Sequence, residues 1–167
     1  MTGIPFSRPV RVEPLPKDGL EQRIEADESE RAALAKLNNL AAISRLSAKF
    51  RITKQRRGVR VEGELTALVT QTCVVSLEPF EAEIAEPIDV AFASSGARKP
   101  DSALAEDEDA PDEIVEGRVD LGALASEFLT LALDPYPRKP GVAFEPPPLA
   151  ADEDSAFAPL LRKNPPE

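Results

Sequence analysis

The chain has 167 residues, enough for one domain of ordinary size with tails, and its 20 basic and 30 acidic residues give a formal net charge of −10. Nucleic acid repels such a protein at long range, so any contact with RNA requires a local basic patch. With no histidine, one cysteine and no glycine-rich phosphate loop, the sequence excludes the common catalytic triads, imidazole metal sites, an internal disulfide and multi-cysteine zinc sites. We therefore expect a protein that is not an enzyme and has no cofactor or small-molecule substrate.

The sequence predicts a cytoplasmic protein that makes no membrane contact. One unpaired cysteine suits a reducing compartment. Met1–Pro9 is too short and too polar for a secretory signal, and no apolar run approaches the ~18 residues needed to span a membrane.

Two short strands and a helix are predicted at the start of the chain. The strands are Arg8–Leu15 and Leu20–Ala26, and the turn between them contains two prolines and a glycine. Asp27 is a good N-cap for the helix, with Glu30 three residues later as in a capping box. The helix should end near Asn38. Its apolar residues form one stripe at spacings of three and four: Ala33, Leu34, Leu37, Leu40 and Ala41.

The apolar pattern then changes from a period of 3.6 to a period of 2, which is typical of strands. Alternating runs at Leu46–Ile52, Val59–Leu77 and Phe80–Phe92 predict three antiparallel strands in a meander, with a polar turn at Lys54–Gly58. Pro87 indicates that the third strand is interrupted or lies at an edge of the sheet.

An acidic segment follows the meander. Asp101–Gly117 contains eight acidic and no basic residues, so removing it takes the net charge from −10 to −2. Its composition predicts a disordered acidic loop at about 93–112, ahead of a short returning strand at Glu113–Gly117. We predict a single domain over residues 1–144 and a disordered proline-rich tail over residues 145–167.

Asp120 should cap a second helix, which ends where Pro135 disfavours helical geometry at the preceding residue. The predicted buried stripe of this helix is Leu121, Leu124, Ala125, Phe128, Leu131 and Ala132. The prolines after the helix stiffen its exit. Tyr136 is predicted to dock on the sheet, and the alternative is that Tyr136 and Arg138 contact a partner.

The strongest charge feature is a basic block. From Arg31 to Val61 there are nine basic residues and no acidic one. Seven of them fall on the predicted hairpin: Arg45, Lys49, Arg51, Lys54, Arg56, Arg57 and Arg60. These residues suit contact with several phosphates. The alternatives are a solvated edge protected by its charges, and pairing with the acidic loop of the same molecule. The block has no aromatic residue, which favours recognition of backbone or shape over base stacking.

The remaining chemistry-bearing residues indicate no reaction. Cys73 alternates with apolar residues and is predicted to be an inert, buried thiol. Glu62, Glu64, Glu81 and Glu83 are outward strand positions with nothing nearby in sequence to raise a carboxylate pKa. Glu127 is either a surface residue or the partner of a basic hairpin residue.

Two sequence blocks together resemble the YceD family of bacterial and chloroplast proteins, named for accumulation of the large-subunit (23S) ribosomal RNA. They are VEGELTALVTQTCVVSLEPF (Val61–Phe80) and DLGALASEFLTLALDPYPRKPG (Asp120–Gly141), and the resemblance extends from Arg8 to Phe144. Many family members have a Cys-x-x-Cys pair where this chain has Cys73 and Ser76, so the resemblance implies no metal or redox role here. It implies a non-enzymatic role in large-subunit biogenesis and brings no catalytic residues.

We expect an α+β fold, in which an antiparallel meander, with a barrel-like curl as an alternative, packs with two amphipathic helices. The expected function is ribosome biogenesis, with the basic hairpin contacting ribosomal RNA or a precursor of the large subunit. The alternative is a protein–protein interaction adaptor that binds an acidic protein partner through the hairpin and other partners through the acidic loop.

Overall fold

The computed structural model describes residues 5–94 and 112–144. Most of the predicted acidic loop and the whole proline-rich tail lie outside these residues. The described elements are, in chain order, β1 (Pro9–Arg11), β2 (Leu20–Glu25), α1 (Glu28–Leu37), β3 (Ala42–Gln55), β4 (Gly58–Thr72), β5 (Pro79–Ser94), β6 (Asp112–Ile114), β7 (Arg118–Asp120) and α2 (Leu121–Ala132). The predicted α+β class is confirmed.

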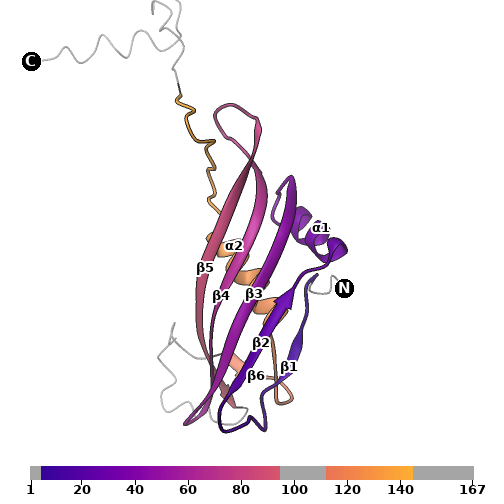
Figure 1. The fold of residues 1–167 in the computed structure, drawn as a ribbon, viewed down its shortest axis with the longest axis vertical. Helices are drawn as coiled ribbons and strands as arrows, with labels where there is room; N and C mark the ends of the chain where they lie inside the picture. The colour runs from indigo at the N-terminus through magenta and orange to yellow at the C-terminus, as the bar shows by residue number, and fades with distance from the viewer. Residues whose placement is uncertain (1–4, 95–111, 145–167) are drawn as a thin grey trace, which may run out of the picture.

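Five strands form the main sheet in the order β2-β3-β4-β5-β6 (Figure 1). Neighbouring strands are antiparallel except for β5 and β6, which are parallel. The three long strands β3, β4 and β5 are the predicted meander, which is confirmed. Pro87 lies on β5, whose outer side pairs with β6 only over Phe92–Ser94. Among the described strands the sheet is open between β2 and β6, so the barrel-like alternative is not formed.

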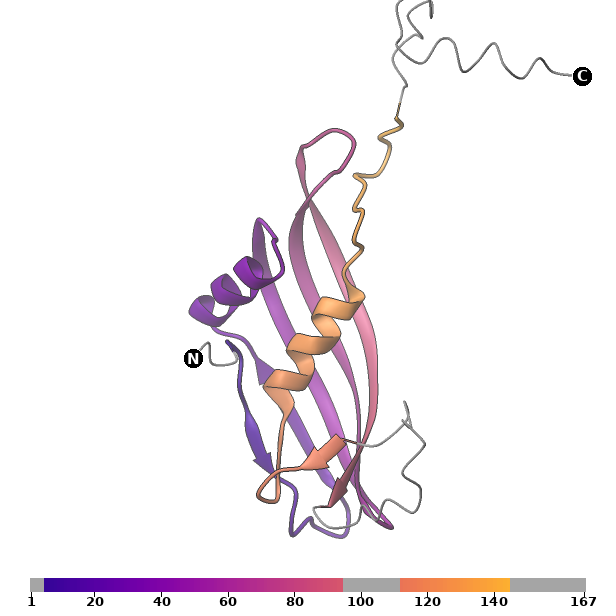
Figure 2. The same cartoon turned by 180° about the vertical axis from the view of Figure 1, so that it is seen from behind.

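The two faces of the sheet have different environments. α2 lies across one face, and no described element covers the other (Figures 1 and 2). The even positions of β3 are buried as predicted, with Leu46, Phe50 and Ile52 in one core with Leu121 and Leu129 of α2. The open face therefore carries the odd positions of β3 and their neighbours, which include most of the predicted basic residues.

Both predicted helix starts are confirmed. Asp27 accepts a hydrogen bond from Glu30 N, and Glu30 accepts one from Asp27 N, which completes the capping box of α1. Asp120 accepts hydrogen bonds from Gly122 N and Ala123 N, both at 3.0 Å, at the start of α2.

The predicted buried stripes of the helices are partly wrong. In α1, Leu34 is buried but Leu37 is 67% exposed, and in α2, Leu129 is buried but Leu131 is 79% exposed. Leu131 lies about 200° around the helix axis from Leu129, so one sheet face cannot cover both. Ala33 and Ala41 are also exposed. Each helix packs on one side only, and that contact is narrower than its apolar stripe.

The N-terminal strand does not join the main sheet. β1 pairs with β7 in a separate two-stranded antiparallel ribbon, although the predicted turn directly connects β1 to β2. Asp120 holds this ribbon in place, because its carboxylate also accepts hydrogen bonds from Arg8 N at 2.7 Å and Ser7 Oγ at 2.5 Å. These contacts join residues more than 100 positions apart in the chain.

The second long strand ends earlier than predicted. β4 stops at Thr72, and the chain makes a compact turn before β5 begins at Pro79. Cys73 N donates to Glu78 O at 2.9 Å, and Leu77 N donates to Cys73 O at 2.9 Å. Leu77, expected on the inward face, is 75% exposed because the turn takes it off the pleat of the strand.

Candidate nucleic-acid interface

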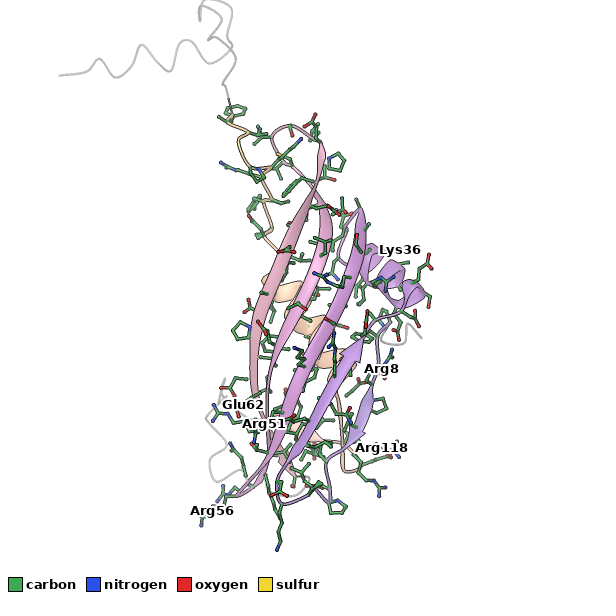
Figure 3. The ribbon with its side chains drawn as sticks, in the orientation of Figure 1. Arg8, Lys36, Arg51, Arg56, Glu62 and Arg118 are labelled. Atoms are coloured by element: carbon green, nitrogen blue, oxygen red, sulfur yellow. The ribbon has the colours of Figure 1, made fainter. Side chains whose placement is uncertain are left out.

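Three basic residues without a described carboxylate partner occupy the tip of the hairpin formed by β3 and β4. Gln55 pairs with Gly58, which leaves Arg56 and Arg57 as the two turn residues. The side chains of Lys54, Arg56 and Arg57 are exposed, and none of them makes an ion pair within residues 5–94 and 112–144. Figure 3 shows Arg56 at one end of the molecule, projecting away from the sheet. The tip is therefore a compact group of available positive charges.

The body of the hairpin is different, because its register brings acidic residues of β4 opposite the basic residues of β3. Arg51 pairs with Glu62 and Lys49 pairs with Glu64 (Figure 3). All four residues lie on the open face. The basic block contains no acidic residue in sequence, yet it is not a uniformly positive surface in space.

Arg60 is neutralised by Asp89, which lies on β5, outside the basic block. Its guanidinium donates from Nε to Asp89 Oδ1 at 2.7 Å and from Nη2 to Asp89 Oδ2 at 2.5 Å, a bidentate pair. Glu62 lies 3.8 Å from Arg60 Nε. These carboxylates raise the pKa of Arg60, with the hydrogen bonds to Asp89 as the largest cause. Arg60 is therefore already engaged.

Two further arginines make long, exposed ion pairs. Arg51 lies 3.7 Å from Glu21, and Arg45 lies 4.0 Å from Glu83, and all four side chains are more than half exposed. Such pairs contribute about 0–1 kcal/mol, so a stronger anion competes with them easily. Arg45 and Arg51 stay available to a ligand in a way that Arg60 does not.

The turn after β4 surrounds a buried thiol with hydrogen-bond donors. Cys73 is buried, as predicted. Its Sγ accepts hydrogen bonds from Val75 N and Ser76 N, both at 3.4 Å. The Ser76 hydroxyl is the largest influence on the thiol. Together with the N–H groups of Ser76, Lys139 and Val75, it lowers the pKa of Cys73 to about 6. The environment is therefore less apolar than the sequence suggested.

The segment Asp134–Arg138 after α2, called the proline box here, is held by its backbone against the turn between β4 and β5. Val74 N donates to Pro137 O at 2.9 Å, and Tyr136 N donates to Asp134 Oδ1 at 2.8 Å. The ring of Tyr136 is nevertheless 71% exposed, so the prediction that it docks on the sheet is wrong. The backbone of the box packs against the turn, and Lys139, just beyond the box, donates from Nζ to Glu78 Oε2 at 2.8 Å, while Tyr136 stays exposed. Arg138 is exposed as well.

Comparison with known proteins decides the family. The model of the family described as "Large ribosomal RNA subunit accumulation protein YceD" matches residues 61–158, more than half of the chain. The chain belongs to the YceD family. No curated protein and no solved structure matches it. The matched range begins in β4 and includes β5, α2 and the proline box, and it leaves β3 and most of the basic block outside.

The YceD-family description gives a role in accumulation of the large ribosomal RNA and names no reaction. In the part of the chain that the structure describes, no group of three or more Cys, Asp or Glu side chains is arranged to hold a metal ion. Within the same residues no helix is long and apolar enough to cross a membrane. Ser76, where the resemblance gives many family members a second cysteine, donates its backbone N–H to Cys73 Sγ at 3.4 Å.

The lowered pKa of the Cys73 thiol predicts that the stability of this YceD protein depends on pH. The pKa of Cys73 is about 6 in the folded chain and about 8.5 when unfolded. A depressed acid pKa contributes stability that is complete above pH ~8.5 and is lost as the pH falls through ~6. We expect the free energy of unfolding to rise between pH 6 and 8.5 in the wild type and not in Cys73→Ala, measured by urea denaturation. If the free energy of unfolding of the wild type and of Cys73→Ala changed in parallel with pH, Cys73 would not be a hydrogen-bonded thiolate.

Sequence reasoning missed two neighbours of the basic hairpin. Asp89 was an outward position of the third strand but was not connected to Arg60, and Arg23 on β2 lies opposite Lys49. No clear signal in the sequence indicated Asp89, because the connection between Thr72 of β4 and Pro79 of β5 is too long to fix the register as a two-residue hairpin turn does. Glu127 is an exposed residue of α2 and makes no ion pair with a described basic residue.

Proposed function

We propose that this YceD-family protein supports accumulation of the large ribosomal RNA by binding that RNA, or a precursor of the large subunit, through the tip of the β3–β4 hairpin. The observation that carries the proposal is the group Lys54, Arg56 and Arg57, exposed and without a described carboxylate partner on a chain of net charge −10. Charge patches guide partners rather than folds, and a basic tip projecting from an anionic protein suits a polyanion.

The other predicted residues contribute unequally to this interface. Arg51, Lys49 and Arg45 lie along β3 at increasing distance from the tip and can exchange weak, exposed contacts for phosphates. Arg60 does so only after it gives up its bidentate pair with Asp89. No aromatic side chain is present at the tip, which favours contact with the RNA backbone. This function requires that the protein lie in the compartment where large subunits are assembled. The sequence predicts that the protein is cytoplasmic.

The direct test is binding of the full chain to precursor large subunits at several salt concentrations, with and without ribonuclease. Each neutralised phosphate contributes ~0.9 to the slope of log affinity against log salt on duplex nucleic acid. We expect a steep slope that disappears after digestion of the RNA. Binding that survives ribonuclease with a shallow slope would favour a protein partner and contradict the proposal.

Release of Arg60 should strengthen the same interaction. Asp89→Asn removes the charge that holds the guanidinium, so Arg60 becomes available as a further phosphate contact. We expect the salt slope to steepen by about 0.9, with little loss of stability because the pair is exposed. The matched control is Glu81→Asn, which removes an outward carboxylate of β5 that holds no arginine. A slope that stays unchanged in Asp89→Asn would exclude Arg60 from the interface.

A protein-interaction adaptor is the second candidate function, and exposure of Tyr136 favours it. The residues on either side of Tyr136 in the chain, Pro135 and Pro137, line a groove of about 730 Å³ together with Leu37, Val74, Leu133 and other residues. Leu37 and Tyr136 are each more than two thirds exposed. Exposed apolar side chains grouped on a surface often mark contact with another protein.

Replacement of Tyr136 by alanine separates a structural role from a binding role. Because the ring is 71% exposed, we expect the melting temperature of Tyr136→Ala to stay within ~1 °C of the wild type. In the adaptor function, the same variant should recover less partner protein in pull-down experiments, whereas Glu127→Ala, an exposed change on α2, should not. A clear loss of melting temperature would show that the ring supports the fold.

A further inference from the structure

A second group of positive charges lies on the ribbon formed by β1 and β7. Arg11 on β1 pairs directly with Arg118 on β7, and both side chains are exposed. The hydrogen bond from Val12 N to Gly117 O flanks this pair, which makes it a non-hydrogen-bonded pair, with Cα atoms about 4.5 Å apart and the side chains close together. Two guanidinium groups thus leave the same face of the ribbon as neighbours.

This arrangement is unfavourable unless an anion lies between the two arginines, because like charges directly opposite one another in a ladder repel. Neither Arg11 nor Arg118 makes an ion pair with any carboxylate of the described residues. Two nearby acidic groups have other partners. Asp120 caps α2 and holds Ser7 and Arg8 N, while Glu13 accepts a hydrogen bond from the Ser94 hydroxyl. Glu116, in the turn before Arg118, is exposed and makes no ion pair with either arginine among the described residues.

The ribbon that carries the pair is rigid. Val12 and Val119 are buried in the core on its inner side, and Leu121 N donates to Arg8 O at 3.1 Å at its end. Little backbone freedom remains to be lost when a ligand is bound, which favours a preorganised site. Arginine suits this site because its planar fork can bind a phosphate through two parallel hydrogen bonds.

A short chain of hydrogen bonds connects the ribbon to the hairpin tip. Ser94 N donates to Arg57 O at 3.0 Å, the Ser94 hydroxyl donates to Glu13, and Glu13 N donates to Gly117 O at 3.2 Å. Gly117 directly precedes Arg118. In Figure 3 Arg118 and Arg56 both lie in the lower part of the molecule, Arg118 on the side of β1. The two cationic groups therefore share one end of the protein.

We propose that Arg11 and Arg118 form a second phosphate-binding site, which grips the RNA backbone at a point separate from the hairpin tip. The proposal rests on the proposed function, because the ligand is the same RNA. Two separate contact points orient an RNA on the protein, which a single contact at the hairpin tip does not. The ligand chemistry is a phosphodiester placed between two guanidinium groups.

The test compares variants of the full chain for binding to a 20-base-pair duplex RNA and to polyglutamate over a range of salt concentrations. Arg11→Gln/Arg118→Gln should reduce the salt slope on RNA by about 1.8, corresponding to two phosphates. The melting temperature should stay equal or rise, because the repulsion between the arginines is removed. Arg11→Lys/Arg118→Lys keeps both charges and should retain most of the slope. The matched control is Lys36→Gln/Arg138→Gln, which removes two exposed charges elsewhere and should leave the slope unchanged.

Three results would overturn the second site, and they are distinguishable from failure of the proposed function. An unchanged slope in Arg11→Gln/Arg118→Gln, while Lys54→Gln/Arg56→Gln/Arg57→Gln lowers it, would leave the hairpin tip as the RNA contact without this site. An equal loss of binding to polyglutamate would indicate an acidic protein as the ligand. If Arg11→Gln/Arg118→Gln had a lower melting temperature, and Arg11→Lys/Arg118→Lys also lost RNA binding, the pair would have a structural role. If the hairpin-tip variant also binds RNA with the wild-type slope, the proposed function itself fails.

Discussion

Reversal of Lys54, Arg56 and Arg57 to glutamate is expected to abolish co-sedimentation with precursor large subunits. Three phosphate contacts are lost, which lowers the salt slope by about 2.7 and the affinity on the order of 100-fold or more. The three side chains are exposed and lie at or beside a two-residue turn, so the fold should be retained. The measurement is sedimentation of the full chain with particles, together with its circular dichroism spectrum and melting temperature.

Arg60 is left out of this variant for a structural reason. A glutamate at position 60 would lie against Asp89 and Glu62, and the resulting repulsion would destabilise the hairpin and obscure the result. The control is Lys36→Glu/Arg138→Glu, which makes the protein similarly more acidic without altering the hairpin tip. If the folded tip variant still sediments with particles as the wild type does, the hairpin is not the RNA contact.

Asp120→Ala is expected to cause the largest loss of stability among single polar substitutions. The carboxylate caps α2 through Gly122 N and Ala123 N and also holds Ser7 and Arg8 of the N-terminal segment. Loss of a cap costs about 1 kcal/mol, and each of the two further hydrogen bonds about 1 kcal/mol. We therefore expect the free energy of unfolding to fall by about 3 kcal/mol in denaturant titration.

Asp120→Asn is the matched control, because an amide oxygen can still accept the hydrogen bonds of the cap. The wild type and Asp120→Asn should differ in how their stability changes at acidic pH. Burial raises the pKa of Asp120, but the hydrogen bonds from Ser7, Arg8 N, Ala123 N and Gly122 N together lower it below its usual value. A depressed carboxyl pKa contributes stability that is present above pH ~4 and is lost as the pH falls through the folded pKa. The stability advantage of the wild type over Asp120→Asn should therefore shrink below pH ~4, and a constant difference would contradict this role.

Local signals in the sequence predicted local structure well. Asp27 with Glu30 and Asp120 with the following N–H groups depend on contacts within three residues, and both caps are formed. The alternation of β3 also predicted its buried face, because one side of the sheet meets α2 and the other does not. These features need no knowledge of which distant segments meet.

Features that depend on distant segments were predicted less well. β1 joins β7 rather than the main sheet because Asp120 holds Arg8 N, a contact that no local pattern indicates. Leu37 and Leu131 belong to apolar stripes but are exposed, since the width of a stripe does not tell how much of it a neighbouring element covers. Val59–Leu77 was extended too far because the residues of the turn after Thr72 continue the alternation.

The charge of the hairpin also depends on residues that are distant in sequence and close in the fold. The basic block has no acidic residue over 31 positions, and this indicated a basic hairpin able to contact several phosphates. The antiparallel register instead places Glu62 opposite Arg51, and β5 brings Asp89 to Arg60. Only the tip, where no strand lies opposite, keeps the predicted character. The candidate site was therefore predicted from sequence, and the structure shows which of its basic residues have no carboxylate partner among the described residues.

The central claim is that the hairpin tip lies against large-subunit ribosomal RNA in the cell. The most direct measurement places a photo-crosslinking amino acid at Gln55, next to the tip charges, and sequences the RNA attached after irradiation of living cells, with Glu127 as the control position. We expect crosslinks from position 55 at one or a few sites of the large ribosomal RNA, and few from position 127. Crosslinks from position 55 to protein alone, or to RNA without enrichment of the large ribosomal RNA, would contradict it.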